Sequence, residues 1–233
     1  MIPLKDINRT RTFPAITLFL ITVNAAVFVY QLSLGTGPVL TRFFYQFGLV
    51  PSALLSFGYW QEAGILLGLV PLFTSMFLHG GWMHFLGNML YLWVFGDNVE
   101  DWLGSLRFLL FYLVCGLLAA LLQMAVHPGS PIPMIGASGA ISGVLAAYLV
   151  LFPRARVLTF VPILFFFYLI RLPALIFLGL WFLLQFFNGA VSLTAGDLSM
   201  GGTAWWAHIG GFVAGLVLIL KTRKSRRRAM VYY

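Results

Sequence analysis

The chain has 233 residues, of which 61% are hydrophobic and only 9% charged, and its mean hydropathy is +0.96. A soluble domain has about a quarter of its residues charged, so this composition excludes a protein covered by a water-facing surface. Lipid is therefore the predicted solvent for most of the chain. Backbone groups in lipid must be hydrogen bonded internally, which restricts the spanning segments to helices or a closed barrel. Continuous apolar runs favour helices.

Six apolar segments are predicted to span the membrane. They cover residues 16–33, 78–96, 108–126, 137–152, 172–187 and 205–220. The first span follows three basic residues, as a signal peptide would, but it is long and no small-residue cleavage site follows it. It is therefore interpreted as a retained anchor. The whole chain, 1–233, is predicted to be one all-α domain with a short basic tail at 221–233.

Two further apolar segments are not assigned as spans. Residues 34–77 are broken by Gly and Pro and are interpreted as a partly embedded loop structure. Residues 157–170 contain Pro162 and have basic residues at both ends, which favours a short interfacial or re-entrant element over another span. The single cysteine, Cys115, excludes an intramolecular disulfide and is interpreted as an apolar filler.

The basic residues predict the orientation of the chain. With six spans both termini share one side of the membrane, and of the 14 lysines and arginines only Arg42 lies on the other side. The positive-inside rule therefore predicts a cell-membrane protein with both termini in the cytoplasm. The net charge of +8 is then a topology signal, helped by anionic lipid at the tail. It requires no binding of nucleic acid.

Three polar features lie inside the predicted spans, where polar side chains are costly and suggest function. His84 and Asn88 are four residues apart in the second span and share a helix face. Ser138 opens the fourth span in the sequence Gly136-Ala-Ser-Gly, and His208 lies in the sixth. Each is also open to a structural interpretation, as a residue that hydrogen bonds a neighbouring helix. For His208 a proton relay is a further alternative.

Glycines accompany the serine and the last histidine. Gly139 and Gly143 in the fourth span, and Gly211 and Gly215 in the sixth, have the four-residue spacing that lets helices pack closely. A serine in such a setting is ordinary, so Ser138 alone does not establish catalysis.

The depths of these polar residues favour a shared site. The second, fourth and sixth spans run in the same direction, and the inner end of each is marked by its first charged residue, Asp97, Arg154 or Lys221. At about 1.5 Å per residue, His84, Ser138 and His208 then lie about 20, 24 and 20 Å above these marks. They are therefore predicted to share a plane near the outer face of a hydrocarbon layer about 30 Å thick.

A nucleophile at this depth needs water. The fourth span is too short to cross the bilayer, so its amino end is predicted to open into a cavity reached from outside. Ser138 then lies in a first helical turn, where free N–H groups and the positive dipole end favour an oxyanion. His208 is the predicted general base for the serine hydroxyl. Asn88 and His84 are predicted to donate to the oxyanion, with Gly136 permitting close approach.

No carboxylate is assigned a third role. The six acids are all placed in loops or termini, away from the depth of His208, and are Asp6, Glu62, Asp97, Glu100, Asp101 and Asp197. The prediction is therefore a Ser–His dyad. Four histidines without cysteine or acid partners make a poor zinc site, so no metal site is predicted.

Three motifs, His84-x-x-x-Asn88, Gly136-Ala-Ser138-Gly139 and Ala207-His208-x-x-Gly211-x-x-x-Gly215, resemble the signature of the rhomboid intramembrane serine proteases. The resemblance extends over essentially the whole chain. It implies a six-helix core, Ser138 as nucleophile, His208 as base, and an oxyanion site formed by Asn88, His84 and the Ser138 N–H beside Gly136. It also implies single-span membrane proteins as substrates, cleavage near the outer face and no cofactor. The fifth span and the loop 188–203 would gate substrate entry.

Two positions depart from the pattern of some family members. Trp60-Gln61 stands where some carry a Trp-Arg pair, and Ser142 stands where some carry an aromatic residue that stacks on the histidine. Another group must therefore orient His208, and Trp205 or Trp206 is the expected one. Two other functions remain as alternatives. A catalytically inactive relative would bind membrane-protein clients, but such proteins typically lose the serine or histidine. A transporter would favour inverted repeats, which are not evident in the sequence.

Overall fold

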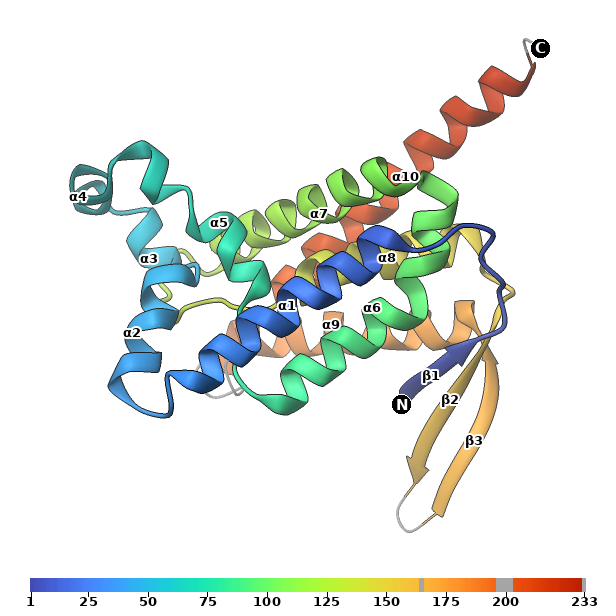
Figure 1. Ribbon diagram of the computed structural model, residues 1–233, viewed down its shortest axis with the longest axis horizontal. Helices are drawn as coiled ribbons and strands as arrows, with labels where there is room; N and C mark the ends of the chain where they lie inside the picture. Colours follow the sequence, from blue (N-terminus) through green and yellow to red (C-terminus); the bar gives the residue numbers. More distant parts are fainter. Residues whose placement is uncertain (164–165, 196–202, 232–233) are drawn as a thin grey trace.

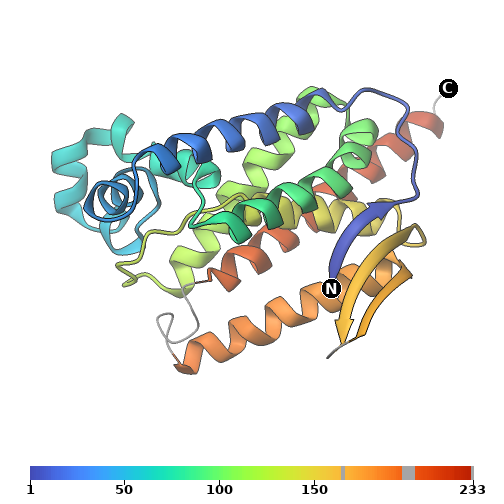
Figure 2. The same ribbon diagram turned by 60° about the horizontal axis from the view of Figure 1, so that its bottom comes forward.

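The computed structural model describes residues 1–163, 166–195 and 203–231. Its long helices form a bundle around α8, with a small sheet at one end and a cluster of short helices at the other (Figures 1 and 2). In chain order the elements are β1 (Ile2–Asp6), α1 (Ala15–Ser33), α2 (Pro38–Phe47), α3 (Pro51–Leu54), α4 (Phe57–Gly68), α5 (Pro71–Thr74), the 3-10 helix η1 (Ser75–Phe77), α6 (Trp82–Leu103), α7 (Ser105–Val126), α8 (Ser138–Leu151), β2 (Arg156–Ile163), β3 (Phe166–Pro173), α9 (Ala174–Ala195) and α10 (Trp205–Val231).

Each predicted span coincides with a helix. Among the described helices, α1, α7, α9 and α10 are long and apolar enough to cross a membrane by length and composition. Helix α8 is apolar but has only 14 residues, and α6 carries three acids in its last turns. The chain is therefore a mostly helical, multi-pass membrane protein. The insert 34–77, predicted as a loop structure, consists largely of the short elements α2 to η1.

The acids of α6 correct the prediction that all carboxylates lie in loops or termini. Asp97, Glu100 and Asp101 belong to the last turns of the helix, which continues beyond the apolar run. Glu100 is buried and accepts hydrogen bonds from the N–H groups of Ile16 and Thr17 at 2.9 and 2.8 Å. A carboxylate at these N–H groups satisfies donors of the first turn of α1 and complements its dipole. It ties the start of α1 to the end of α6.

The fold is not all-α, because residues 156–163 and 166–173 form two strands. The prediction that segment 157–170 is not another span agrees with this, and its interfacial or re-entrant placement stays a prediction. Strands β2 and β3 pair antiparallel from Arg156↔Pro173 to Ile163↔Phe166, and β1 adds to β2 with Ile2↔Phe160 and Asp6↔Val157. β-branched and aromatic residues dominate this segment, and they favour strands. The order of the sheet is β1-β2-β3, and it lies beside the bundle near the start of α9 (Figure 1).

Two helices are longer than predicted. Helix α9 continues to Ala195, so the first half of the predicted loop 188–203 is helical, and residues 196–202 lie outside the described part of the chain. The indole N–H of Trp206 and the hydroxyl of Ser192 both donate to the Gly189 carbonyl, at 3.1 and 2.8 Å, which stabilises this extension. Helix α10 continues to Val231, so the basic tail 221–233 begins as part of a helix (Figure 1).

Asp6 anchors the sheet to the bundle. Its carboxylate accepts hydrogen bonds from the Tyr148 hydroxyl at the end of α8 and from the Asn98 side chain of α6. Burial, with a smaller contribution from the charge of Asp97, raises the pKa of Asp6 from 3.8 to about 6. The folded protein therefore keeps this carboxyl protonated up to a higher pH than the unfolded chain does.

The stability of the fold is expected to depend on Asp6 between about pH 4 and 6. Because the folded state holds this proton more tightly than the unfolded state, the contribution of Asp6 to stability falls as the pH rises through about 6. The variant Asp6→Asn removes this titration and keeps an acceptor for Tyr148. Its Tm in detergent, relative to the wild type, is expected to rise between pH 4.5 and 7.5. A Tm difference that stays constant over this range would contradict the prediction.

Glycines bring α8 and α10 into direct backbone contact. A Cβ on Gly211 would overlap the Gly139 carbonyl, and a Cβ on Gly215 would overlap the backbone of Gly143. A Cβ on Gly143 would also lie 2.5 Å from the Cys115 side chain of α7. No residue larger than glycine fits at these crossings, so α8 packs directly against both α7 and α10. Residues 139–148 of α8 are all buried.

The variant Gly211→Ala is expected to destabilise the bundle by about 1–3 kcal/mol, because backbone cannot yield as a side chain does. The measurement is Tm in detergent. The matched control is Gly179→Ala on α9, where a Cβ meets nothing within 4 Å and alanine improves helix propensity. Equal Tm values for the two variants would show that the α8–α10 contact is not tight.

Candidate active site

The loop before α8 sets the position of Ser138. Met134 and Leu49 form a β-bridge, with N···O distances of 2.7 and 3.0 Å. This bridge ties the loop to the part of the insert 34–77 that connects α2 with α3. Gly136 has a φ of 124°, which favours glycine, and its N–H donates to the Ser75 carbonyl at 2.8 Å. The chain then turns into α8 with Ser138 as its first residue. The serine therefore stands where helix N–H groups lack intrahelical partners.

Ser138 opens onto a large cavity. Its volume is about 940 Å³, and it lies between the N-terminal ends of α6, α8 and α10 and the side of α9. The lining includes the predicted polar residues and a set of apolar ones, namely Trp82, His84, Asn88, Tyr91, Ser138, Ile141, Trp181, Gln185 and His208. This volume is ample for an extended peptide segment of a few residues.

His208 and Ser138 are brought into hydrogen-bond contact. The distance from His208 Nε2 to Ser138 Oγ is 2.8 Å, across the glycine-lined crossing of α8 and α10. The depth argument from the sequence placed these two residues in one plane, and the fold gives them this direct contact. A hydroxyl in contact with an imidazole nitrogen is the geometry that a general base needs.

Gln185 of α9 is a site residue that the sequence analysis missed. Its Oε1 lies 2.8 Å from His208 Nδ1, and the rings of Trp181 and Trp205 both lie 6.0 Å from the imidazole, measured between centroids. The Trp205 ring lies edge-on to the imidazole, whereas the Trp206 indole donates to α9. That Trp205 orients His208 stays a prediction. The sequence signal for this residue is an amide side chain within the apolar span 172–187, where polar groups are costly.

The predicted oxyanion residues differ in what they offer. Asn88 Nδ2 is buried and, among the described residues, has no hydrogen-bond partner. His84 lies against Gly136, where an added Cβ would be 2.6 Å from its Nε2, while its Nδ1 faces the Gly80 N–H at 3.4 Å. The Gly136 N–H, in contrast, is already donated to Ser75. Gly136 therefore serves this site by leaving space for the His84 ring, and its N–H is not free to bind an oxyanion.

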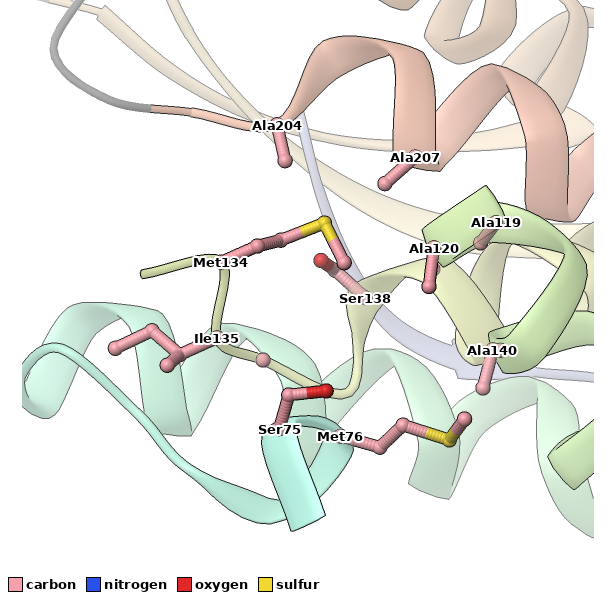
Figure 3. Close-up of a pocket in the computed structure, with 13 residues that line it drawn as sticks. Ser75, Met76, Ala119, Ala120, Met134, Ile135, Ser138, Ala140, Ala204 and Ala207 are labelled. Atoms are coloured by element: carbon pink, nitrogen blue, oxygen red, sulfur yellow. The ribbon is translucent and has the colours of Figure 1, made fainter. Parts of the chain in front are cut away.

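A second, much smaller cavity lies beside Ser138 (Figure 3). Its volume is about 20 Å³, enough for about one water molecule. Small side chains of α7, α8 and α10 and the side chains of Ser75, Met76 and Met134 surround it (Figure 3). Its walls offer few polar groups other than the two serines. In the described part of the chain, no three His, Cys, Asp or Glu residues are grouped as metal ligands would be.

A family model for the Rhomboid domain matches residues 66–225, which is more than half of the chain. The chain belongs to the rhomboid family. This rhomboid is 35% identical to Rhomboid protease GluP of Bacillus subtilis over 136 residues, 58% of this chain and 24% of that protein. It is 29% identical to Rhomboid protein 1, mitochondrial, of Saccharomyces cerevisiae over 153 residues, 64% of this chain and 40% of that protein.

A third relative is the human Presenilin-associated rhomboid-like protein, mitochondrial, which is 35% identical over 95 residues. That match covers 40% of this rhomboid and 25% of the human protein. The chain thus corresponds to less than half the length of each of these relatives. Since two of them are mitochondrial by name, the relatives do not identify one membrane.

Proposed function

We propose that this rhomboid is an intramembrane serine endopeptidase that cleaves single-span membrane proteins near the outer face of the bilayer. The observation that carries the proposal is the 2.8 Å contact between His208 Nε2 and Ser138 Oγ, inside a cavity of about 940 Å³. The Bacillus subtilis relative, Rhomboid protease GluP, is named as a protease, which supports the same activity.

In the proposed reaction, Ser138 Oγ forms a bond to the carbonyl carbon of the scissile peptide while its proton passes to His208 Nε2. The carbonyl π electrons move to the oxygen, which accepts hydrogen bonds from the Ser138 N–H and from Asn88 Nδ2, with His84 as a further donor. The C–N bond then breaks, and the leaving nitrogen takes the proton from His208. Water, activated by the same base, hydrolyses the acyl-enzyme and regenerates Ser138.

The unpartnered amide of Asn88 supports its part in this scheme. An unsatisfied buried donor costs about 1–3 kcal/mol, and a negatively charged oxygen formed only during the reaction offsets this cost at the transition state. The position of Ser138 also favours the reaction, because it begins a helix whose first N–H groups and dipole favour a negatively charged oxygen.

The variants Ser138→Ala and His208→Ala are expected to abolish cleavage of a model single-span substrate in liposomes. A serine-directed fluorophosphonate probe is expected to label the wild type and not Ser138→Ala, because the probe reacts with an activated hydroxyl. Both variants remove side chains at the cavity wall, so Tm serves as the control for folding. A folded wild type that neither cuts a panel of substrates nor labels would favour an inactive rhomboid that binds membrane-protein clients.

The proposal includes a topology. Helices α1, α6, α7, α8, α9 and α10 form the six spans of one domain, the insert 34–77 is partly embedded, and both termini lie in the cytoplasm beneath the cell membrane. The distribution of lysine and arginine supports this orientation.

Labelling with a membrane-impermeant maleimide tests the orientation. In a Cys115→Ser background, a cysteine placed by Ser56→Cys in the insert is expected to label in intact cells. A cysteine placed by Ile7→Cys, where the native side chain is 58% exposed, is expected to label only after the cells are opened. The reverse pattern would invert the topology and refute cleavage at the outer face by this site.

A further inference from the structure

Gln185 is a buried amide on a helix whose neighbouring residues face outward. Its side chain belongs to a residue that is only 7% exposed, whereas Leu184 and Phe186 on either side are 55% and 52% exposed. Burying an amide is costly unless its polar atoms are paired. Both polar atoms of this amide have a partner, and one of the partners is His208.

The two contacts of Gln185 fix which way its amide points. Nε2 donates to the Trp181 carbonyl one turn earlier on α9, at 3.2 Å. Oε1 therefore faces His208 Nδ1, at 2.8 Å. Since an amide oxygen only accepts hydrogen bonds, Nδ1 must carry the proton of the neutral imidazole. Nε2 is then left with its lone pair directed at the Ser138 hydroxyl, 2.8 Å away.

We propose that Gln185 is the positioning residue of this site: it accepts the Nδ1 proton of His208 and so holds the imidazole in the tautomer that can take the proton of Ser138. This inference rests on the proposed protease function and adds a third member to the dyad. In serine hydrolases with a triad a carboxylate fills this place. An amide gives orientation and tautomer without burying a charge beside lipid, where an ionised carboxylate would be costly.

The position of Gln185 also makes the base depend on the packing of two helices. Gln185 is carried by α9 and His208 by α10, and their hydrogen bond exists only while the two helices are docked. One turn further along α9, the Trp206 indole of α10 donates to the Gly189 carbonyl at 3.1 Å and fastens the same pair of helices. Without this contact between α9 and α10, the Nδ1–H group of His208 loses its acceptor, and the imidazole is no longer held in the tautomer that leaves Nε2 free to act as a base.

The test compares Gln185→Met, which keeps the shape of the side chain and removes the acceptor, with Gln185→Glu, which keeps an acceptor. In liposomes, Gln185→Met is expected to lower kcat by about 10²–10⁴-fold with KM changed by less than about threefold. Gln185→Glu is expected to stay within about tenfold of the wild-type kcat. Leu184→Met, on the adjoining exposed position, is the control and is expected to leave kcat unchanged.

The second readout is the tautomer itself. The chain has four histidines, so ¹⁵N-histidine spectra can be assigned to His208 by difference from His208→Ala. The wild type and Gln185→Glu are expected to show a proton on Nδ1, and Gln185→Met a mixture of tautomers. A wild-type kcat and an unchanged tautomer in Gln185→Met would overturn the inference. Equal losses of kcat and Tm in both Gln185 variants would reduce Gln185 to a structural role and overturn it as well.

These outcomes are separable from failure of the proposed function. If the wild type and Ser138→Ala cut the substrate equally well, the protease proposal fails, regardless of what the Gln185 variants do. If Ser138→Ala is inactive and Gln185→Met is as active as the wild type, only the role of Gln185 fails.

Discussion

The backbone contact between α8 and α10 is the constraint on which the rest of the molecule depends. Gly211 and Gly215 meet the carbonyls of Gly139 and Gly143 without an intervening side chain. In lipid, where apolar groups gain little from leaving the solvent, such close packing is a main source of helix association. The same contact sets the distance between Ser138 and His208, because each stands within one turn of a crossing glycine. Stability and chemistry thus rely on the same small residues.

The buried polar groups of this rhomboid are of two kinds. Glu100 and Asp6 are surrounded by donors in the structure, and they join elements that are distant in sequence: α1 to α6, and β1 to α8. Asn88, in contrast, has a buried amide nitrogen without a partner among the described residues, and it faces the cavity. Satisfied groups stabilise the ground state of the protein. An unsatisfied donor is free to form a hydrogen bond with a charge that develops only during a reaction.

The sequence predicts the helices well because a long apolar run has few alternatives in lipid. It predicts the approach of Ser138 to His208 because three parallel helices of known rise per residue place these side chains at similar depths. The sheet escapes prediction, since the apolar run 157–170 suits a strand as well as a buried helix and β1 pairs with it from far away. Gln185 escapes because a single amide in an apolar span belongs to no motif. The role of Asn88 remains a prediction.

The pairing of β1 with β2 has a consequence for how the chain is made. Ile2 is synthesised before its partner Phe160, and α1, α6, α7 and α8 lie between these two residues in the chain. Until then β1 has an unpaired edge, and Asp6 lacks the hydroxyl of Tyr148. Contacts between residues so distant in sequence form late, after the local helices. Strand β1 is therefore synthesised before α1, yet it is among the last segments to acquire its native partners.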